Sequence, residues 1–175
     1  PRTSAVAVEG MGDAVVALSG SGNHTCALTA AGAVRCWGDN AYGQLGNATT
    51  TFSPVPLDAQ GLGSGVLAIS AGPSHTCALT ASREVRCWGA NGSSQLGTGD
   101  SVDRNVPAAV ANLPARVTDV SVGNGFTCVV FTGRTVRCWG DNGDGQLGLG
   151  DTTPRLSWEP ITALPRTSSV SAGDA

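Results

Sequence analysis

The chain has 175 residues and a net charge of −3, and all ten of its basic residues are Arg. A weakly acidic chain without a basic cluster is a poor binder of nucleic acid or anionic membranes, and no apolar run approaches the ~18 residues of a membrane span. The 25 Gly and 9 Pro are too few for a linker or a collagen-like chain, while 41% hydrophobic residues can form a core. We therefore expect a folded domain with no nucleic-acid partner and no membrane insertion.

One motif occurs three times in the chain, at a constant spacing of 51 residues. Its landmarks are HTCALT at 24–29, repeated at 75–80 and degraded to FTCVVF at 126–131. The pentad VRCWG and the triplet QLG recur at the same spacing. Internal repeats with a period of 20 to 50 residues are typical of solenoids, propellers and arrays. The pentad begins at Val34, Val85 and Val136, and the triplet at Gln44, Gln95 and Gln146.

Each copy predicts four short strands in the same order. A short apolar run comes first, at 15–19 and 66–70. HTCAL and VRCW then flank a turn of small residues, which is Ala30-Ala31-Gly32 in the first copy. A weaker fourth strand carries prolines, which donate no ladder hydrogen bonds and favour a sheet edge; it is predicted at 53–57, 105–110 and 158–162. No sustained 3.6-residue period favours helix, so the pattern predicts an all-β chain of four-stranded antiparallel propeller blades.

The motif resembles the regulator of chromosome condensation repeat family. Residues 34–46 match the family pattern V-x-C-W-G-x-N-x-x-G-Q-L-G in full. The second copy departs from it at Ser94, and the third at Phe126, Val129 and Val130. The resemblance covers almost the whole chain and implies a propeller of seven four-stranded blades. The residues expected in the repeat core are Trp37, Trp88, Trp139, His24, His75, Leu45, Leu96 and Leu147, and those expected in turns are Gly46, Gly97 and Gly148.

The phase of the repeat predicts about three blades, at 14–57, 65–110 and 115–162. Residues 1–13 then match the outer strand of a preceding blade, and residues 163–175 the inner strand of a following one. A seven-bladed ring at this period needs roughly twice the length, and repeat arrays need caps or neighbours to cover their ends. Two interpretations follow: further blades in a longer parent chain, which we favour, or self-association as a dimer or filament.

Six cysteines form three pairs that are ten residues apart. In an antiparallel hairpin centred on Ala31, Cys26 and Cys36 stand directly opposite one another, close enough for a cross-strand disulfide. The same geometry recurs in the other two copies. We therefore predict three disulfides within blades and an oxidising compartment, whether extracellular, cell-surface or periplasmic. The remaining pairs are Cys77 with Cys87 and Cys128 with Cys138.

Two features of the sequence suggest metal sites, and each also has a structural explanation. His24 and His75 precede a Cys by two residues, but the cysteine spacing is wide for zinc and the third copy has Phe126 instead. Residues 141–145 (DNGDG) fail the ligand spacing of a calcium loop. We therefore predict no metal and no cofactor, and we expect the two histidines to be buried hydrogen-bonding groups.

The Arg that precedes each Cys-Trp pair shares the Trp side of its strand. The favoured interpretation packs the Trp between blades and covers it with the Arg stem; the alternative is a cation–π ladder. These residues are Arg35, Arg86 and Arg137. Sequons at Asn23, Asn47 and Asn91 are of a kind that arises often by accident in a Gly- and Ser-rich chain, and they leave glycosylation open.

No catalytic constellation is present in the sequence, so we expect no enzyme. The favoured function is a secreted or cell-surface scaffold that binds a protein partner through blade-connecting loops, as a propeller-type enzyme inhibitor does. The alternatives are a structural subunit of an extracellular assembly or fibre, a propeller-type enzyme inhibitor and, remotely, nucleotide exchange on a small GTPase. The absence of Lys with abundant Ala, Gly and Arg favours a bacterial source.

Overall fold

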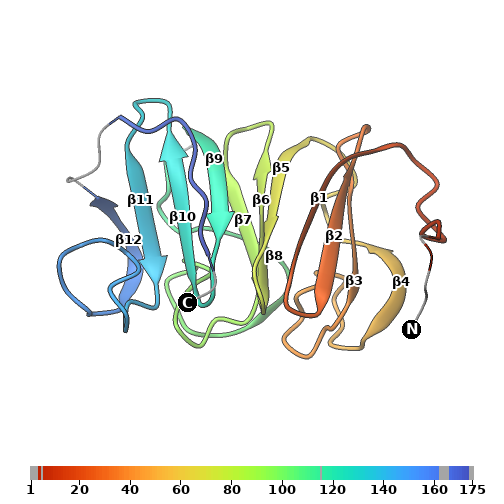
Figure 1. Ribbon diagram of the computed structural model, residues 1–175, viewed down its shortest axis with the longest axis horizontal. Helices are drawn as coiled ribbons and strands as arrows, with labels where there is room; N and C mark the ends of the chain where they lie inside the picture. Colours follow the sequence, from red (N-terminus) through yellow and green to blue (C-terminus); the bar gives the residue numbers. More distant parts are fainter. Residues whose placement is uncertain (1–3, 5, 115, 162–165, 174–175) are drawn as a thin grey trace.

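The computed structural model describes residues 4, 6–114, 116–161 and 166–173, and these form three four-stranded antiparallel sheets without a helix. The sheets stand side by side along the long axis (Figure 1). The first holds β1 (Val15–Ser21), β2 (His24–Thr29), β3 (Val34–Gly38) and β4 (Ser53–Asp58). The second holds β5 (Val66–Ala71), β6 (His75–Thr80), β7 (Val85–Gly89) and β8 (Arg104–Ala109). The third holds β9 (Val117–Val122), β10 (Phe126–Phe131), β11 (Val136–Gly140) and β12 (Arg155–Ile161).

The order of strands within each sheet follows the chain, so the predicted blade architecture is confirmed. The proline-bearing strands β4, β8 and β12 are the outer edges, as expected for strands that cannot complete a ladder. The third outer strand begins at Arg155, three residues before its predicted start. The prediction began at the apolar residue Trp158, whereas the first strand residue is an Arg that pairs with Asp151 and Glu159.

The central hairpin of each blade has the predicted register. Cys26 stands opposite Cys36, and Leu28 stands opposite Val34. The same pairing recurs at Cys77 with Cys87 and at Cys128 with Cys138. Each pair forms a disulfide with its Cα atoms 4.1 Å apart, and no cysteine is free. The prediction of three disulfides within blades is therefore confirmed.

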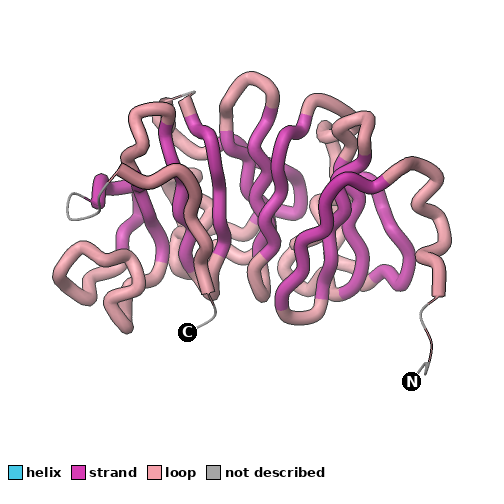
Figure 2. Tube along the Cα trace, turned by 45° about the horizontal axis from the view of Figure 1, so that its top comes forward, coloured by secondary structure: helices cyan, strands magenta, loops and turns pink. Residues whose placement is uncertain are grey.

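The blades pack face to face in a fixed sense. The face of the first blade that carries the Cys26–Cys36 disulfide forms one core with Trp88 of the second blade. The disulfide face of the second blade does the same with Trp139 of the third. Since successive side chains of a strand point to opposite faces, the alternation of Cys and Trp in VRCWG gives every blade one disulfide face and one Trp face. Figure 2 shows the resulting row of twisted sheets.

The two ends of the row carry segments that are not strands. Residues 6–8 lie beside the first blade and residues 166–173 beside the third. The amide of Ala172 donates to Ser121 Oγ, as Ala71 donates to Ser19 Oγ and Val122 to Ser70 Oγ. The segment around Ala172 thus takes the place of an inner strand next to β9. The blade and end boundaries proposed from the sequence include residues 1–3, 5, 115, 162–165, 174 and 175, which lie outside the described residues.

Candidate functional site

A tryptophan socket joins each pair of neighbouring blades. Trp88 is fully buried, and its indole Nε1 donates to the carbonyl oxygen of Gln44 at 2.8 Å. Trp139 is equally buried and donates to the carbonyl of Gln95 at 2.8 Å. The indole lies over the glycine that ends QLG: a Cβ at Gly46 would come within 2.7 Å of Trp88 Nε1. That position has a positive φ of 71° and faces a ring, so it requires glycine for two reasons.

A histidine and a threonine reinforce the same socket. His24 Nε2 lies 2.8 Å from Thr76 Oγ1, and that hydroxyl donates to the Gln44 carbonyl. Because the hydroxyl has one proton and gives it to the carbonyl, the histidine is the donor through Nε2–H. His75 and Thr127 repeat this arrangement at 2.9 Å. The two histidines are therefore placed where their strand is tied to the next blade.

Burial holds both histidines in the neutral form. Desolvation lowers the pKa of His24 to about 4, and the nearby Asp39 carboxylate opposes the shift. Desolvation, with a smaller contribution from His24, lowers the pKa of His75 to about 3. Each Nδ1 is buried without a hydrogen-bond partner. Protonation would bury a charge and an unpaired donor, so these residues serve as structural ties.

Trp37 differs from the other two tryptophans in being only half-buried. Together with residues 6–9 and the outer strand, it lines a cavity of about 440 Å³. Leu18 of the same face is 65% exposed, whereas its equivalent Ile69 packs into the core between the first two blades. The expectation of a substantially buried ring therefore fails at Trp37, because no preceding blade covers this face within the described residues.

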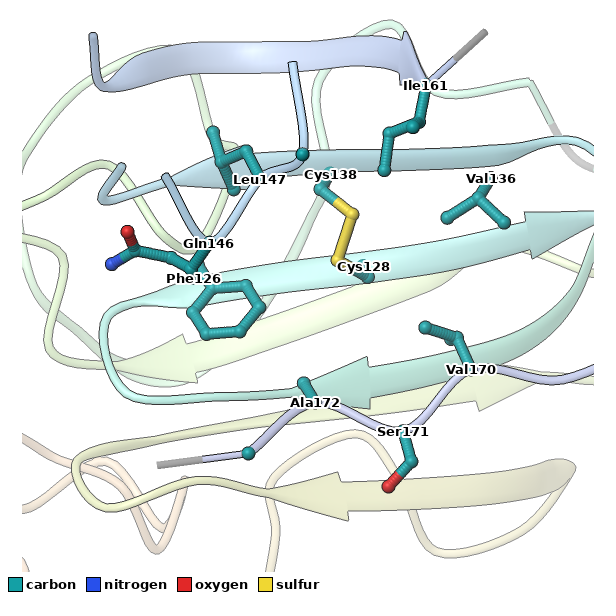
Figure 3. Close-up of a pocket in the computed structure, with 12 residues that line it drawn as sticks. Phe126, Cys128, Val136, Cys138, Gln146, Leu147, Ile161, Val170, Ser171 and Ala172 are labelled. Atoms are coloured by element: carbon teal, nitrogen blue, oxygen red, sulfur yellow. A yellow bond between two sulfur atoms is a disulfide. The ribbon is translucent and has the colours of Figure 1, made fainter. Parts of the chain in front are cut away.

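The socket on the third blade contains no indole. Leu147 is fully buried there beside the Cys128–Cys138 disulfide, and Gln146 and Gly148 border a cavity of about 360 Å³. Figure 3 shows Phe126 and Leu147 around this cavity, with Ala172 on its other side. The carbonyl of Gln146 accepts no hydrogen bond from the described residues, unlike those of Gln44 and Gln95.

A buried asparagine organises each long loop at the end of VRCWG. Asn40 Oδ1 accepts from the amide of Leu45, and its Nδ2 donates to the carbonyls of Thr49 and Thr51. Asn91 and Asn142 make the equivalent bonds, and all three side chains are fully buried. They were not among the predicted site residues, although their 51-residue recurrence signals a role. Since Asn91 is enclosed, its sequon is closed to glycosylation in the folded protein.

No cluster of three or more His, Cys, Asp or Glu that could hold a metal occurs among the described residues. In the DNGDG segment, the side-chain amide of Asn142 donates to the carbonyl of Asp151 and so closes the loop. Asp141 Oδ1 accepts from the backbone amide of Gly143. These are the bonds of a turn.

The Arg–Trp ladder considered from the sequence is replaced by other contacts. Arg137 stacks on the rings of Phe131 and Trp158, with its Cζ 4.1 Å from the Trp158 ring centre. Arg35 pairs instead with Asp58 and Asp13. Arg35 and Arg137 thus each have a partner on the outer strand of their own blade, Asp58 and Trp158.

The loops between the third and fourth strands of each blade gather on one rim, at the lower side of Figure 1. Their frameworks match, but the exposed positions differ. Tyr42 is 48% exposed where the other copies have Ser93 and Asp144, and Phe52 is 62% exposed where they have Asp103 and Pro154. The first loop therefore displays two aromatic rings that the repeat does not require.

Comparisons with known proteins agree with this architecture. The model of the regulator of chromosome condensation (RCC1) repeat matches residues 31–79, 84–130 and 135–175. The ultraviolet-B receptor UVR8 of Arabidopsis thaliana is 35% identical over 156 residues, which are 87% of this chain and 35% of that protein. The human E3 ubiquitin-protein ligase HERC2 is 34% identical over 81% of this chain, but only 3% of HERC2 is covered.

Solved structures show the same fold. Human WBSCR16 superposes with a TM-score of 0.84 at 22% identity, over 97% of this chain and 45% of that chain. Yeast RCC1 (Prp20) bound to Kap60 superposes with a TM-score of 0.74 at 21% identity, over 91% of this chain and 40% of that one. The chain spans less than half the length of these relatives. Since the family model matches most of the chain and the solved structures share its fold, the chain belongs to the regulator of chromosome condensation (RCC1) repeat family.

Proposed function

We propose that this chain is a non-catalytic protein-binding propeller module of an oxidising compartment, with its partner seated on the rim of long loops. The observation that carries the proposal is the pair of exposed rings, Tyr42 and Phe52. Large aromatic side chains are enriched at the energetic centres of protein interfaces. Their equivalents in the other two blades are small or polar, so the rings are not needed for folding and are available for binding.

Charge supports the same rim and indicates the partner's chemistry. The three long loops, 39–52, 90–103 and 141–154, contain six Asp and no Arg. Two of these Asp pair with an Arg at the start of the neighbouring outer strand, Asp100 with Arg104 and Asp151 with Arg155. The rim as a whole stays acidic, which favours a partner with a basic surface around an apolar centre.

The related Prp20p of Saccharomyces cerevisiae has binding properties towards Gsp1p and histones. Gsp1p and histones are partners of that relative. For this chain they support only the general proposal that it binds a protein. Three disulfides favour a secreted, cell-surface or periplasmic setting. Within the described residues, no helix is long and apolar enough to cross a membrane.

A site-specific photo-crosslinking experiment tests the proposal. A benzophenone side chain at Tyr42 should crosslink one discrete protein in the extracellular or cell-surface fraction of the source organism. The matched control carries the probe at Ser82, an exposed position in a turn of the opposite rim. Phe52→Ser in the Tyr42 probe protein should reduce the crosslink at least tenfold, because about 2 kcal/mol is expected from an aromatic anchor. Equal crosslinking from both rims, or none, would contradict the proposal.

A further inference from the structure

We propose that a cavity on the loop rim, between the first two blades, receives an arginine side chain of the partner protein. The cavity has a volume of about 220 Å³. It is lined by Ala41, Tyr42, Thr50, Asp103 and Asn105. The first long loop supplies one wall, and the end of the second loop with the start of β8 supplies the other. The inference rests on the proposed function above, because it names the chemistry by which that partner is held.

The side chains of this cavity are not required by the repeat. At the interface between the second and third blades, the 51-residue period places other residues at the positions of its four larger side chains. Those residues are Ser93, Ser101, Pro154 and Leu156. That interface forms without an aromatic ring or a carboxylate at these positions. Of the two blade interfaces within the described residues, one therefore combines a ring with an acidic group, and both groups are available for a ligand.

Asp103 carries a charge that its neighbours leave unpaired. Within the part of the chain that the structure describes, Asp103 forms no ion pair. The adjacent Arg104 pairs with Asp100 at 2.5 Å, and its guanidinium donates to the backbone carbonyls of Val102 and Asp103. The three long loops contain no Arg. The charge that lines the cavity is therefore negative, which favours a cationic ligand.

Hydrogen bonds from both blades fix the walls of the cavity. The amide of Ala48 donates to the carbonyl of Asn105 at 2.9 Å. The two walls also approach closely, since a Cβ at Gly43 would lie 2.5 Å from Asn105 Cα. Asp103 Oδ1 accepts from the backbone amide of Asn91 at 2.7 Å, which orients the carboxylate. The binding groups are thus held in place before a ligand arrives, and this lowers the entropic cost of binding.

Arginine fits this set of groups better than lysine does. A planar guanidinium stacks on an aromatic ring and binds a carboxylate through its fork of N–H groups, so it can use Tyr42 and Asp103 together. The side-chain oxygens of Thr50 and Asn105 are further acceptors for its five donors. A lysine ammonium is a compact charge with three donors and no planar face.

The position of the cavity favours a side chain of a protein over a free small cation. Tyr42, Asp103 and Asn105 are all exposed, so the cavity opens at the rim. Tyr42 also belongs to the pair of exposed rings on which the partner is proposed to sit. A protein that covers these rings would place its own side chains directly over the cavity.

The cavity is probed with Nα-acetyl-arginine amide at constant ionic strength. Titrated into the isotope-labelled chain, it should shift the amide signals of Gly43 and Asn105 saturably, with half-saturation in the millimolar range. The citrulline analogue has the same shape without the charge and should give no saturable shift. The lysine analogue should bind more weakly than arginine. Absence of saturable shifts with arginine, or equal binding of either analogue, would overturn the proposal.

Two variants of the chain locate the binding site. Asp103→Asn keeps an oxygen acceptor for the Asn91 amide but removes the charge, and it should weaken binding of the arginine probe at least about threefold. The matched control is Asp144→Asn, which removes an exposed carboxylate from the third loop and should leave binding unchanged. Equal effects of the two variants would mean that the probe responds to the general charge of the rim, and the cavity would not be the site.

Crosslinking distinguishes an arginine of the partner from a free cation. A benzophenone side chain at Phe52 leaves Tyr42 and the cavity intact and should capture the same protein as the probe at Tyr42. Asp103→Asn should reduce this crosslink at least about threefold, and Asp144→Asn should not. A crosslink that Asp103→Asn leaves unchanged would refute the cavity's role while the proposed function stands. If neither aromatic position crosslinks a protein, the proposed function fails, and a cavity that still binds the arginine probe is a small-cation site instead.

Discussion

The buried His–Thr ties make the stability of the blade row depend on pH. In the unfolded chain a histidine titrates near its ordinary pKa of 6.5, whereas in the fold His24 and His75 have pKa values of about 4 and about 3. Below about pH 6.5 the unfolded state therefore binds more protons than the folded state. The neutral histidines therefore make their full contribution to the unfolding free energy above that pH. This contribution is lost as the pH falls towards their pKa values in the folded state.

Between about pH 6 and 4.5, we expect the unfolding free energy to fall by up to about 1.4 kcal/mol per pH unit for each histidine. Urea denaturation across this range measures the slope. His75→Phe combined with Thr127→Val reproduces the third copy's apolar position and should remove about half of it. An unchanged slope in that double variant would assign the pH dependence to groups other than His75.

The three tryptophans should differ in their contribution to stability. Trp88→Ala and Trp139→Ala each empty a closed socket and should cost about 3–5 kcal/mol. Trp37→Ala removes a half-buried ring and should cost less than half as much. Denaturant unfolding of the three variants compares them directly. Equal losses at all three positions would mean that Trp37 is as enclosed in solution as the other two.

At the scale of the element, the hairpin is the unit that the chain repeats. Its register is set by a short turn and locked by a disulfide across it, while a buried asparagine shapes the long loop that follows. The disulfides of the first two blades are covered by the next blade, whereas Cys128–Cys138 borders the open cavity. The same disulfide therefore stands in two environments, one enclosed between two blades and one buried beside a cavity.

Without reductant, alkylation should modify no cysteine, because all six are paired. During graded reduction under native conditions, Cys128 and Cys138 should be alkylated first, since a thiolate must reach the sulfur to exchange. Peptide mapping by mass spectrometry gives the order. Simultaneous reduction of all three pairs would show that the protein unfolds before any single disulfide is attacked.

At the scale of the whole molecule, the chain is a row of three blades with unlike ends. The second blade is covered on both faces by its neighbours. Within the described residues, the first blade has no other blade on its Trp face, and the third has none on its disulfide face, where Val170 and Ala172 pack against the core. In such arrays, stability is roughly the sum of each unit and its nearest-neighbour contacts. The middle blade therefore has the largest share of interface.

Native-state hydrogen exchange should follow this order. The amides of β6 and β7 should be the slowest to exchange, and those of β1 and β12 the fastest. The strands of the end blades have fewer packed neighbours, so they can open locally without unfolding the rest of the protein. Exchange measured by NMR or mass spectrometry gives the protection of each strand. Uniform protection along the row would indicate that the three blades open as one cooperative unit.

Much of the fold could be predicted from the sequence because its information is local and repeated. The cysteine spacing and the small-residue turn determined the hairpin register, the prolines marked the outer strands, and the period of 51 residues gave the number of blades. The family resemblance added the propeller and the expected core residues. The start of β12 was missed, because its first residue is an Arg that is stabilised by side-chain pairing rather than by an apolar pattern.

The tertiary structure decided what each repeated residue faces. Trp37 and Trp88 stand in identical pentads, yet within the described residues a preceding blade packs only against Trp88, so identical sequence gives different burial. The same holds for Gly46 and Gly148, one beneath an indole and the other beside a cavity. The sequence by itself determined the blade, because strands, turns and disulfides form within one repeat; the sockets depend on contacts between repeats, and these follow from where a blade stands in the row.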